Sequence, residues 1–256
     1  MELQKRLISF RKNIMLKRKL IIDTYISNHS SNICVFCATK NNITKEHVLP
    51  KWTFEGCTKK YFNTSTNGVS QTYNRTVVPC CKHCNGFILG HLEHRIKHIF
   101  KNSDLNVNHF KEKELELIIL WLETIAYKLQ VMDIRRKFNK AKDSEYIPFL
   151  ANFPIAIMQN HASLNPSKVF SNFRNSLKRL TTKSKFNRFN SLVVFKTKNP
   201  DFNFMHSSNN FIYLELPKYK VAFFYFIIED FDEHKKAFEK SMKIIKEELY
   251  SEENNI

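Results

Sequence analysis

The sequence of 256 residues contains few of the residues that make long flexible connections, with four glycines and seven prolines. That composition argues against extended disordered linkers. It also lacks a run of about 20 apolar residues, the length needed for a transmembrane helix. The N-terminus is basic but has no apolar core followed by small residues, which a secretory signal peptide would show. We therefore expect a cytoplasmic protein with no membrane partner.

Acidic residues are also scarce. The chain has 41 Lys or Arg against 24 Asp or Glu, a formal net charge of +17, and the segment 147–200 contains no Asp or Glu at all. A large positive charge favours a polyanionic partner, although a Lys- and Asn-rich composition typical of an AT-rich genome would also produce one. In the acid-free segment, basic residues alternate with phenylalanines that we expect to lie in the core, so the charges either bind phosphates or form the solvated edge of that core. The candidate nucleic-acid-binding residues of this segment are Lys178, Arg179, Lys183 and Lys185.

Four of the six cysteines form two pairs with zinc-knuckle spacing. Cys34 and Cys37 make the first C-x2-C pair, and Cys81 and Cys84 make the second. Each knuckle can fill two of the four positions of a tetrahedral Zn²⁺, and four thiolates leave no open position for water. The sequence therefore predicts a structural zinc ion. Cys80 adjoins the second pair, but the equal spacing of the two knuckles selects Cys81 as the ligand.

A polar trio accompanies these knuckles. Glu46 and His47 begin an E-H-V-x-P step between them, and Asn85 directly follows the last cysteine. Histidine can act as a base because its ordinary pKa lies near neutrality, and carboxylate and amide oxygens suit Mg²⁺ or Mn²⁺. A carboxylate, an imidazole and an amide beside a basic surface indicate metal-assisted phosphodiester hydrolysis. Neighbouring strand residues point to opposite faces, so Glu46 and His47 can face one metal only if the strand bends there.

These blocks resemble the HNH endonucleases, above all the zinc-braced ββα-metal branch of the endonuclease VII type. That branch carries C-x2-C, [D/E]-H-[I/V]-x-P and C-x2-C-N blocks, and the resemblance covers roughly residues 30–100. It implies that His47 is the general base and that Glu46 and Asn85 hold the catalytic cation. Many relatives have Asp where this chain has the longer Glu46.

The resemblance is incomplete at two positions. The middle Asn of the HNH pattern would fall near Thr76, where it braces a loop in relatives. Glu93 matches an acidic position on the helix of some relatives, and we expect it either to support the site or to form a salt bridge with a neighbouring Lys or Arg.

The hydrophobic patterns predict an α+β protein in three parts. They indicate a basic amphipathic helix over residues 1–29 and an α+β region for substrate grip or partner contact over residues 103–256. Between them, the resemblance implies that residues 30–102 form the ββα-metal HNH nuclease module. Within the module we expect a polar loop over 53–76 and a helix over 85–101. The expected elements after the module are a helix over 112–140, strands over 192–198, 211–216 and 221–228, and a final helix over 231–250.

The sequence thus predicts a metal-dependent HNH endonuclease that hydrolyses DNA. The alternative is a non-catalytic, zinc-stabilised nucleic-acid-binding module, in which Glu46, His47 and Asn85 are incidental. The motif does not separate DNA from RNA, because other residues must sense the 2′-hydroxyl. By analogy, such proteins act as phage-defence or restriction effectors, often under the control of a regulatory protein partner.

Overall fold

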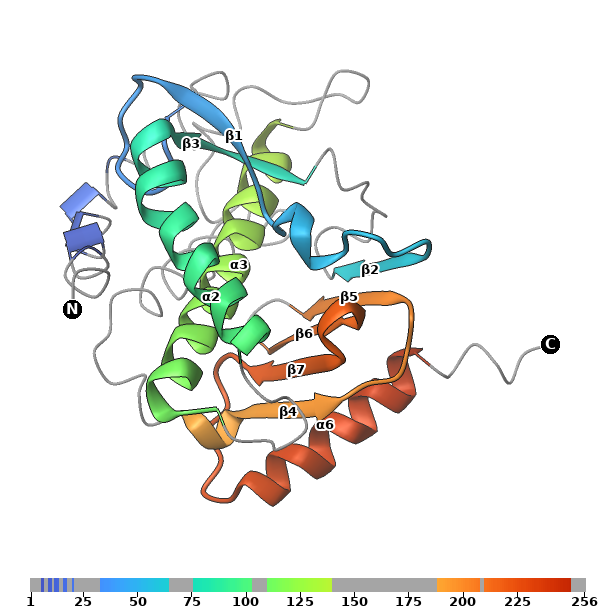
Figure 1. Ribbon diagram of the computed structural model, residues 1–256. Coiled ribbons are helices and arrows are strands. Elements are labelled where there is room, and N and C mark those ends of the chain that lie inside the picture. Colours follow the sequence, from blue (N-terminus) through green and yellow to red (C-terminus); the bar gives the residue numbers. More distant parts are fainter. Residues whose placement is uncertain are drawn as a thin grey trace.

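The cysteine pairs flank a two-stranded hairpin that is followed by a helix (Figure 1). The computed structural model describes residues 33–64, 76–102, 110–139, 188–207 and 210–249, together with positions 6, 9, 10, 12, 13, 16, 17 and 20. The candidate nucleic-acid-binding residues of the acid-free segment, Lys178, Arg179, Lys183 and Lys185, lie outside the described residues.

The hairpin joins β1 (Ile43–His47) to β3 (Val77–Cys81) in antiparallel register, with Glu46 opposite Val78 and His47 opposite Val77. Pro79 is tolerated in β3 because a two-stranded sheet consists of edge strands only. The chain then enters a π-helical turn, η3 (His83–Leu89), which continues as α2 (Gly90–Asn102). The helix predicted over 85–101 is confirmed.

The second sheet has five strands in the order β2-β5-β6-β7-β4. Its members are β2 (Lys60–Thr64), β4 (Leu192–Lys196), β5 (Phe202–Ser207), β6 (Phe211–Leu216) and β7 (Val221–Phe226). All neighbours are antiparallel except β2, which runs parallel to β5. The turn between β6 and β7 is η7 (Pro217–Tyr219), closed by Lys220 in the left-handed conformation with φ 53°.

The prediction of a loop over the whole of 53–76 was wrong for residues 60–64. This segment forms β2 because its partner strand, β5, comes from a distant part of the chain that no local pattern reveals. Phe62 fixes the contact, since its ring centroid lies 5.3 Å from that of Phe202 and 6.3 Å from that of Phe204. The segment between the hairpin strands is therefore built into the second sheet.

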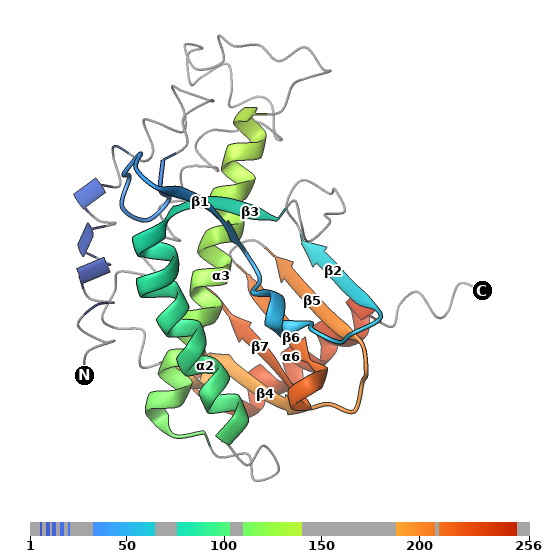
Figure 2. The same ribbon diagram turned by 45° about the horizontal axis from the view of Figure 1, so that its top comes forward.

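Helices cover both faces of this sheet (Figures 1 and 2). Along β7, Phe223 and Tyr225 pack in the core shared with α2 and with α3 (Glu112–Asn139). The alternate residues Phe224 and Phe226 pack in a second core with α6 (His234–Leu249). Because both faces are buried, β7 is apolar at every position, as a central covered strand should be.

The long helix α3 is buried on all sides from Ile118 to Met132. The sequence predicts it as an amphipathic helix over 112–140; its range is confirmed, but its polar face is covered as well. Its buried polar groups must then find partners inside the protein. The Tyr225 hydroxyl, for example, donates a hydrogen bond of 2.9 Å to Glu123 Oε1, which ties α3 to β7.

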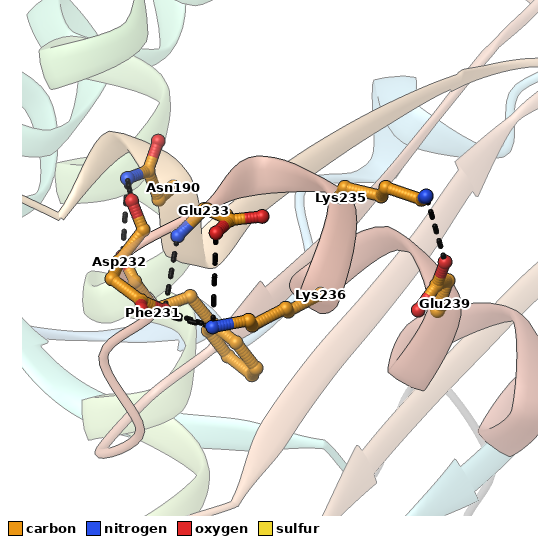
Figure 3. Close-up of polar contacts among 7 residues, drawn as sticks. All are labelled: Asn190, Phe231, Asp232, Glu233, Lys235, Lys236 and Glu239. Atoms are coloured by element: carbon orange, nitrogen blue, oxygen red, sulfur yellow. Dashed lines mark hydrogen bonds and ion pairs between the residues drawn. The ribbon is translucent and has the colours of Figure 1, made fainter.

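The start of α6 is fastened to the turn before β4 (Figure 3). Asn190 Nδ2 donates to the backbone oxygens of Phe231 and Asp232 at 3.1 and 2.9 Å. Asp232 accepts from Lys236 Nζ at 2.9 Å, and this ammonium lowers the pKa of the Asp232 carboxyl. These contacts fix where α6 begins over the second core.

The described N-terminal positions are helical, and Arg6 and Phe10 among them contact the cysteine-bearing region. The Phe10 ring centroid lies 4.9 Å from that of Phe36, which belongs to the first cysteine pair's turn, and the Arg6 guanidinium lies 3.8 Å above the Phe87 ring. No helix in the described part of the chain combines the length and apolar character needed to cross a bilayer.

Candidate metal centre and adjoining pocket

Cys34, Cys37, Cys81 and Cys84 form a cluster whose sulfur atoms all lie within 4.8 Å of one another. The Sγ atoms of Cys37 and Cys81 are 3.7 Å apart. Tetrahedral zinc with Zn–S bonds of about 2.3 Å separates its sulfurs by about 3.8 Å, so the cluster has dimensions that fit the ion. The cluster contains Cys81 rather than Cys80, as the spacing predicts.

Backbone hydrogen bonds shape the two knuckles. In the first, Cys34 N donates to Thr39 O and Ala38 N donates to Cys34 O, both at 2.9 Å, and Ala38 adopts φ 61°. Val35 N donates to Pro79 O at 3.0 Å, which attaches this knuckle to β3. In the second, Cys84 N donates to Cys81 Sγ at 3.4 Å. These bonds bring the two pairs together at one end of the hairpin.

The thiols influence one another strongly. Hydrogen bonds from neighbouring thiols, Cys37 first, lower the pKa of Cys34. The same pairing raises the pKa of Cys37 to about 12, and hydrogen bonding to Cys34 raises the pKa values of Cys80 and Cys84. One thiolate therefore suppresses the ionisation of the others. A dication would allow four thiolates to form together, because its charge replaces the shared protons.

A pocket of about 390 Å³ lies beside the end of β1. Glu46 and His47 both line it, although neighbouring strand residues ordinarily point apart. Strand β1 ends at His47, where the chain turns towards η1 (Lys51–Thr53), and this supplies the bend that the sequence requires. The other lining residues are Pro50, Lys51, Trp52, Glu55, Glu93 and Lys97.

Glu46 is bound to a lysine of α3. Lys128 Nζ lies 2.8 Å from Glu46 Oε1 and also donates to the backbone oxygen of His47 at 2.8 Å. Both side chains are nearly inaccessible, with 2% of Lys128 and 10% of Glu46 exposed. The carboxylate predicted to hold a cation thus already has a cationic partner within the protein.

The surroundings of His47 favour its neutral form. Burial lowers its pKa below the ordinary value of 6.5, and the positive charges of Lys128 and Lys51 lower it further, whereas Glu46 raises it. A neutral imidazole can accept a proton, so the environment suits a base working near neutral pH.

Glu93 places a further carboxylate at the pocket, besides Glu46 and Glu55. It comes from α2 and accepts a hydrogen bond of 3.4 Å from Trp52 Nε1. Within the described residues, this hydrogen bond takes the place of the salt bridge that we considered for Glu93. Burial raises the pKa of Glu93, and nearby Glu46 adds to the rise while Lys128 opposes it. Glu46 and Glu93 therefore line the same pocket and influence each other's charge.

Asn85, the third residue of the polar trio, lies outside the pocket lining. Its Nδ2 donates to Thr44 Oγ1 at 3.0 Å, and Thr44 in turn donates to Cys80 O at 2.7 Å. Thr76, where the HNH pattern has Asn, supplies its backbone oxygen to Val48 N at 2.9 Å. A loop-bracing bond therefore exists at that position without the Asn side chain.

The sequence reasoning missed Lys128 and gave Glu93 a minor role. One signal for Lys128 was present: it is a lone basic residue inside the apolar segment from Ile118 to Met132, where a charge needs a buried partner. Comparisons of this chain with protein-family models, with curated proteins and with solved structures found no match. The functional argument therefore rests on the residues and their geometry.

Proposed function

We propose that the protein is a metal-dependent endonuclease of the HNH type that hydrolyses DNA phosphodiester bonds. One observation carries the proposal: Glu46, His47 and Glu93, from β1 and α2, line a single pocket at the end of β1, and the four-cysteine cluster lies at the other end of the β1–β3 pair. A histidine in a pocket that three carboxylates and two lysines also line matches the needs of phosphodiester hydrolysis.

In this mechanism His47 accepts the proton of the attacking water. Its lowered pKa keeps the imidazole unprotonated at neutral pH. Glu46 and Glu93, which line the pocket, would hold Mg²⁺ or Mn²⁺, and we propose Asn85 of η3 as a further ligand although its amide here donates to Thr44. When bound, the cation would neutralise charge that develops on the phosphoryl and leaving oxygens. Lys51 and Lys97 line the pocket and attract the substrate phosphate.

The zinc would have a structural task. Four thiolates saturate a tetrahedral ion, so this centre would bind no water and take no part in the reaction. It would fix the first knuckle against β3, the partner strand of β1, which carries Glu46 and His47, and against η3, which carries Asn85. We further propose that the protein acts in phage defence or restriction, with a regulatory protein partner.

A non-catalytic nucleic-acid-binding module is the second candidate. It is favoured by the partners that Glu46 and Asn85 already have, Lys128 and Thr44, since both contacts would stabilise a purely structural unit. Such a module has no use for a neutral histidine in a pocket with three carboxylates, and we therefore prefer the endonuclease.

The decisive experiment incubates zinc-loaded protein with supercoiled plasmid, single-stranded DNA and RNA, each with Mg²⁺, Mn²⁺ or a chelator. We expect metal-dependent cleavage of DNA that is lost in His47→Ala. The matched control is His94→Ala, which removes an exposed histidine of α2 and should cleave normally. Binding without cleavage by the wild-type protein, under every metal condition, would favour the non-catalytic module.

A further inference from the structure

Lys128 is a buried lysine that contacts two neighbouring residues of the candidate site. Its Nζ lies 2.8 Å from Glu46 Oε1 and 2.8 Å from the backbone oxygen of His47, and 2% of its side chain is exposed. Lysine is almost never fully buried unless it is paired, because an ammonium loses its hydration inside the protein. The contacts with Glu46 and His47 are therefore what allows Lys128 to be buried.

Lys128 and the pocket lie on different sides of the Glu46 carboxylate. Glu46 lines the pocket but Lys128 does not, so the ammonium reaches the carboxylate from the protein interior. Within the described residues, the carboxylate receives this one donor, at Oε1. Glu46 Oε2 thus has no hydrogen-bond donor in the described part of the chain, and it belongs to a side chain that faces the pocket.

The position of Lys128 is itself rigid. It lies on α3, where Tyr127 donates its hydroxyl proton to Val35 O in the first knuckle and Glu123 accepts from Tyr225 of β7. These bonds attach α3 to the cysteine-bearing region on one side and to the five-stranded sheet on the other. Groups held by packed, hydrogen-bonded neighbours keep a ligand in a fixed orientation.

We infer that Lys128 is a positioning residue for the candidate cation site: it holds Glu46 by Oε1 and His47 by its backbone, so that Oε2 and the imidazole face the same pocket. This inference rests on the proposed function. It also explains how consecutive strand residues come to share one pocket, since a single ammonium anchors both where β1 ends. The residue comes from outside the segment that resembles HNH enzymes.

The test measures Mn²⁺ binding directly, by electron paramagnetic resonance of the free ion, on zinc-loaded protein. Lys128→Met should weaken Mn²⁺ binding by about 10- to 100-fold, the usual effect of losing a group that orients a metal ligand. Glu123→Gln is the matched control, because it alters another buried acidic or basic residue of α3 that bonds to β7 and neither lines the pocket nor contacts Glu46. It should leave Mn²⁺ affinity unchanged.

Two results would overturn the inference. Unchanged affinity in Lys128→Met would show that the lysine only stabilises the fold, and tighter binding would show that it competes with the cation for Glu46. Should Lys128→Met fail to fold, Lys128→Gln keeps a hydrogen-bond donor without the charge and should fall between wild type and complete loss. Affinity equal to wild type in a folded Lys128→Gln protein would also contradict the inference.

The same measurements separate the inference from the proposed function. Lysine-dependent Mn²⁺ binding by a wild-type protein that cleaves no nucleic acid would remove the endonuclease and leave the positioning role. Cleavage by the wild-type protein, together with Mn²⁺ affinity that does not depend on Lys128, would support the endonuclease and remove the positioning role.

Discussion

Replacing Glu46 should damage the fold as well as any activity. In Glu46→Ala, Lys128 would remain as a buried ammonium without its carboxylate, since the two are 2.8 Å apart with 2% and 10% of their side chains exposed. Removing one partner of a buried ion pair typically costs about 3–5 kcal/mol. For a chain of this size, each kcal/mol lowers the melting temperature by about 2–4 °C, which gives a total of about 6–20 °C.

The assay is thermal or urea unfolding at fixed zinc concentration and neutral pH. The double variant Glu46→Ala/Lys128→Met should recover most of the lost stability, because the uncompensated charge is gone. Glu55→Ala is the matched control: it removes an exposed carboxylate from the same pocket and should change stability little. A double variant as unstable as Glu46→Ala, or a single variant as stable as wild type, would refute the reasoning.

Three further predictions concern the base, the zinc and the basic segment. His47→Ala should lower the cleavage rate by about 10²–10⁴-fold and leave the unfolding curve the same as that of the wild type. In the wild type, the acidic limb of the pH–rate profile should have its midpoint below 6.5, because the active form of His47 is neutral and its pKa is lowered. A midpoint at or above 6.5 contradicts this prediction. Cys81→Ser should lose the zinc found by elemental analysis at about one ion per chain, whereas Cys80→Ser should keep it; equal zinc contents in the two would disprove the quartet. Neutralising four basic residues together should flatten the salt dependence of duplex binding by about 0.9 log units per lost phosphate contact, and an unaltered slope would place the nucleic-acid surface elsewhere. Those four residues are Lys178, Arg179, Lys183 and Lys185.

The cysteine cluster and the helix after it could be predicted because their signals are local. A C-x2-C spacing reports the geometry of one turn, and Leu92, Ile96 and Ile99 report the buried face of one helix. The choice of Cys81 over Cys80 followed from spacing alone and is confirmed by the cluster.

The contact between Lys128 and Glu46 could not be predicted in this way. Its two residues are 82 positions apart in the chain, and each taken alone resembles a solvated charge. On α3, the apolar stripe correctly indicated a helix, but periodicity does not reveal that the polar side is covered too. β2 was missed for the same reason: a short segment with polar flanks becomes a strand only through its partner β5.

The placement of β2 has a consequence for how the chain is made. This strand is synthesised between the two hairpin strands, yet its parallel partner, β5, is synthesised much later. Until β5 leaves the ribosome, β2 has no ladder to join, and non-local parallel pairing is slow to form. Lys128 also precedes β5 in the chain, so its contact with Glu46 can form before the five-stranded sheet is complete. A truncated product that ends after α2 would carry the whole polar trio and both cysteine pairs, but it would expose an unpaired strand edge prone to aggregation.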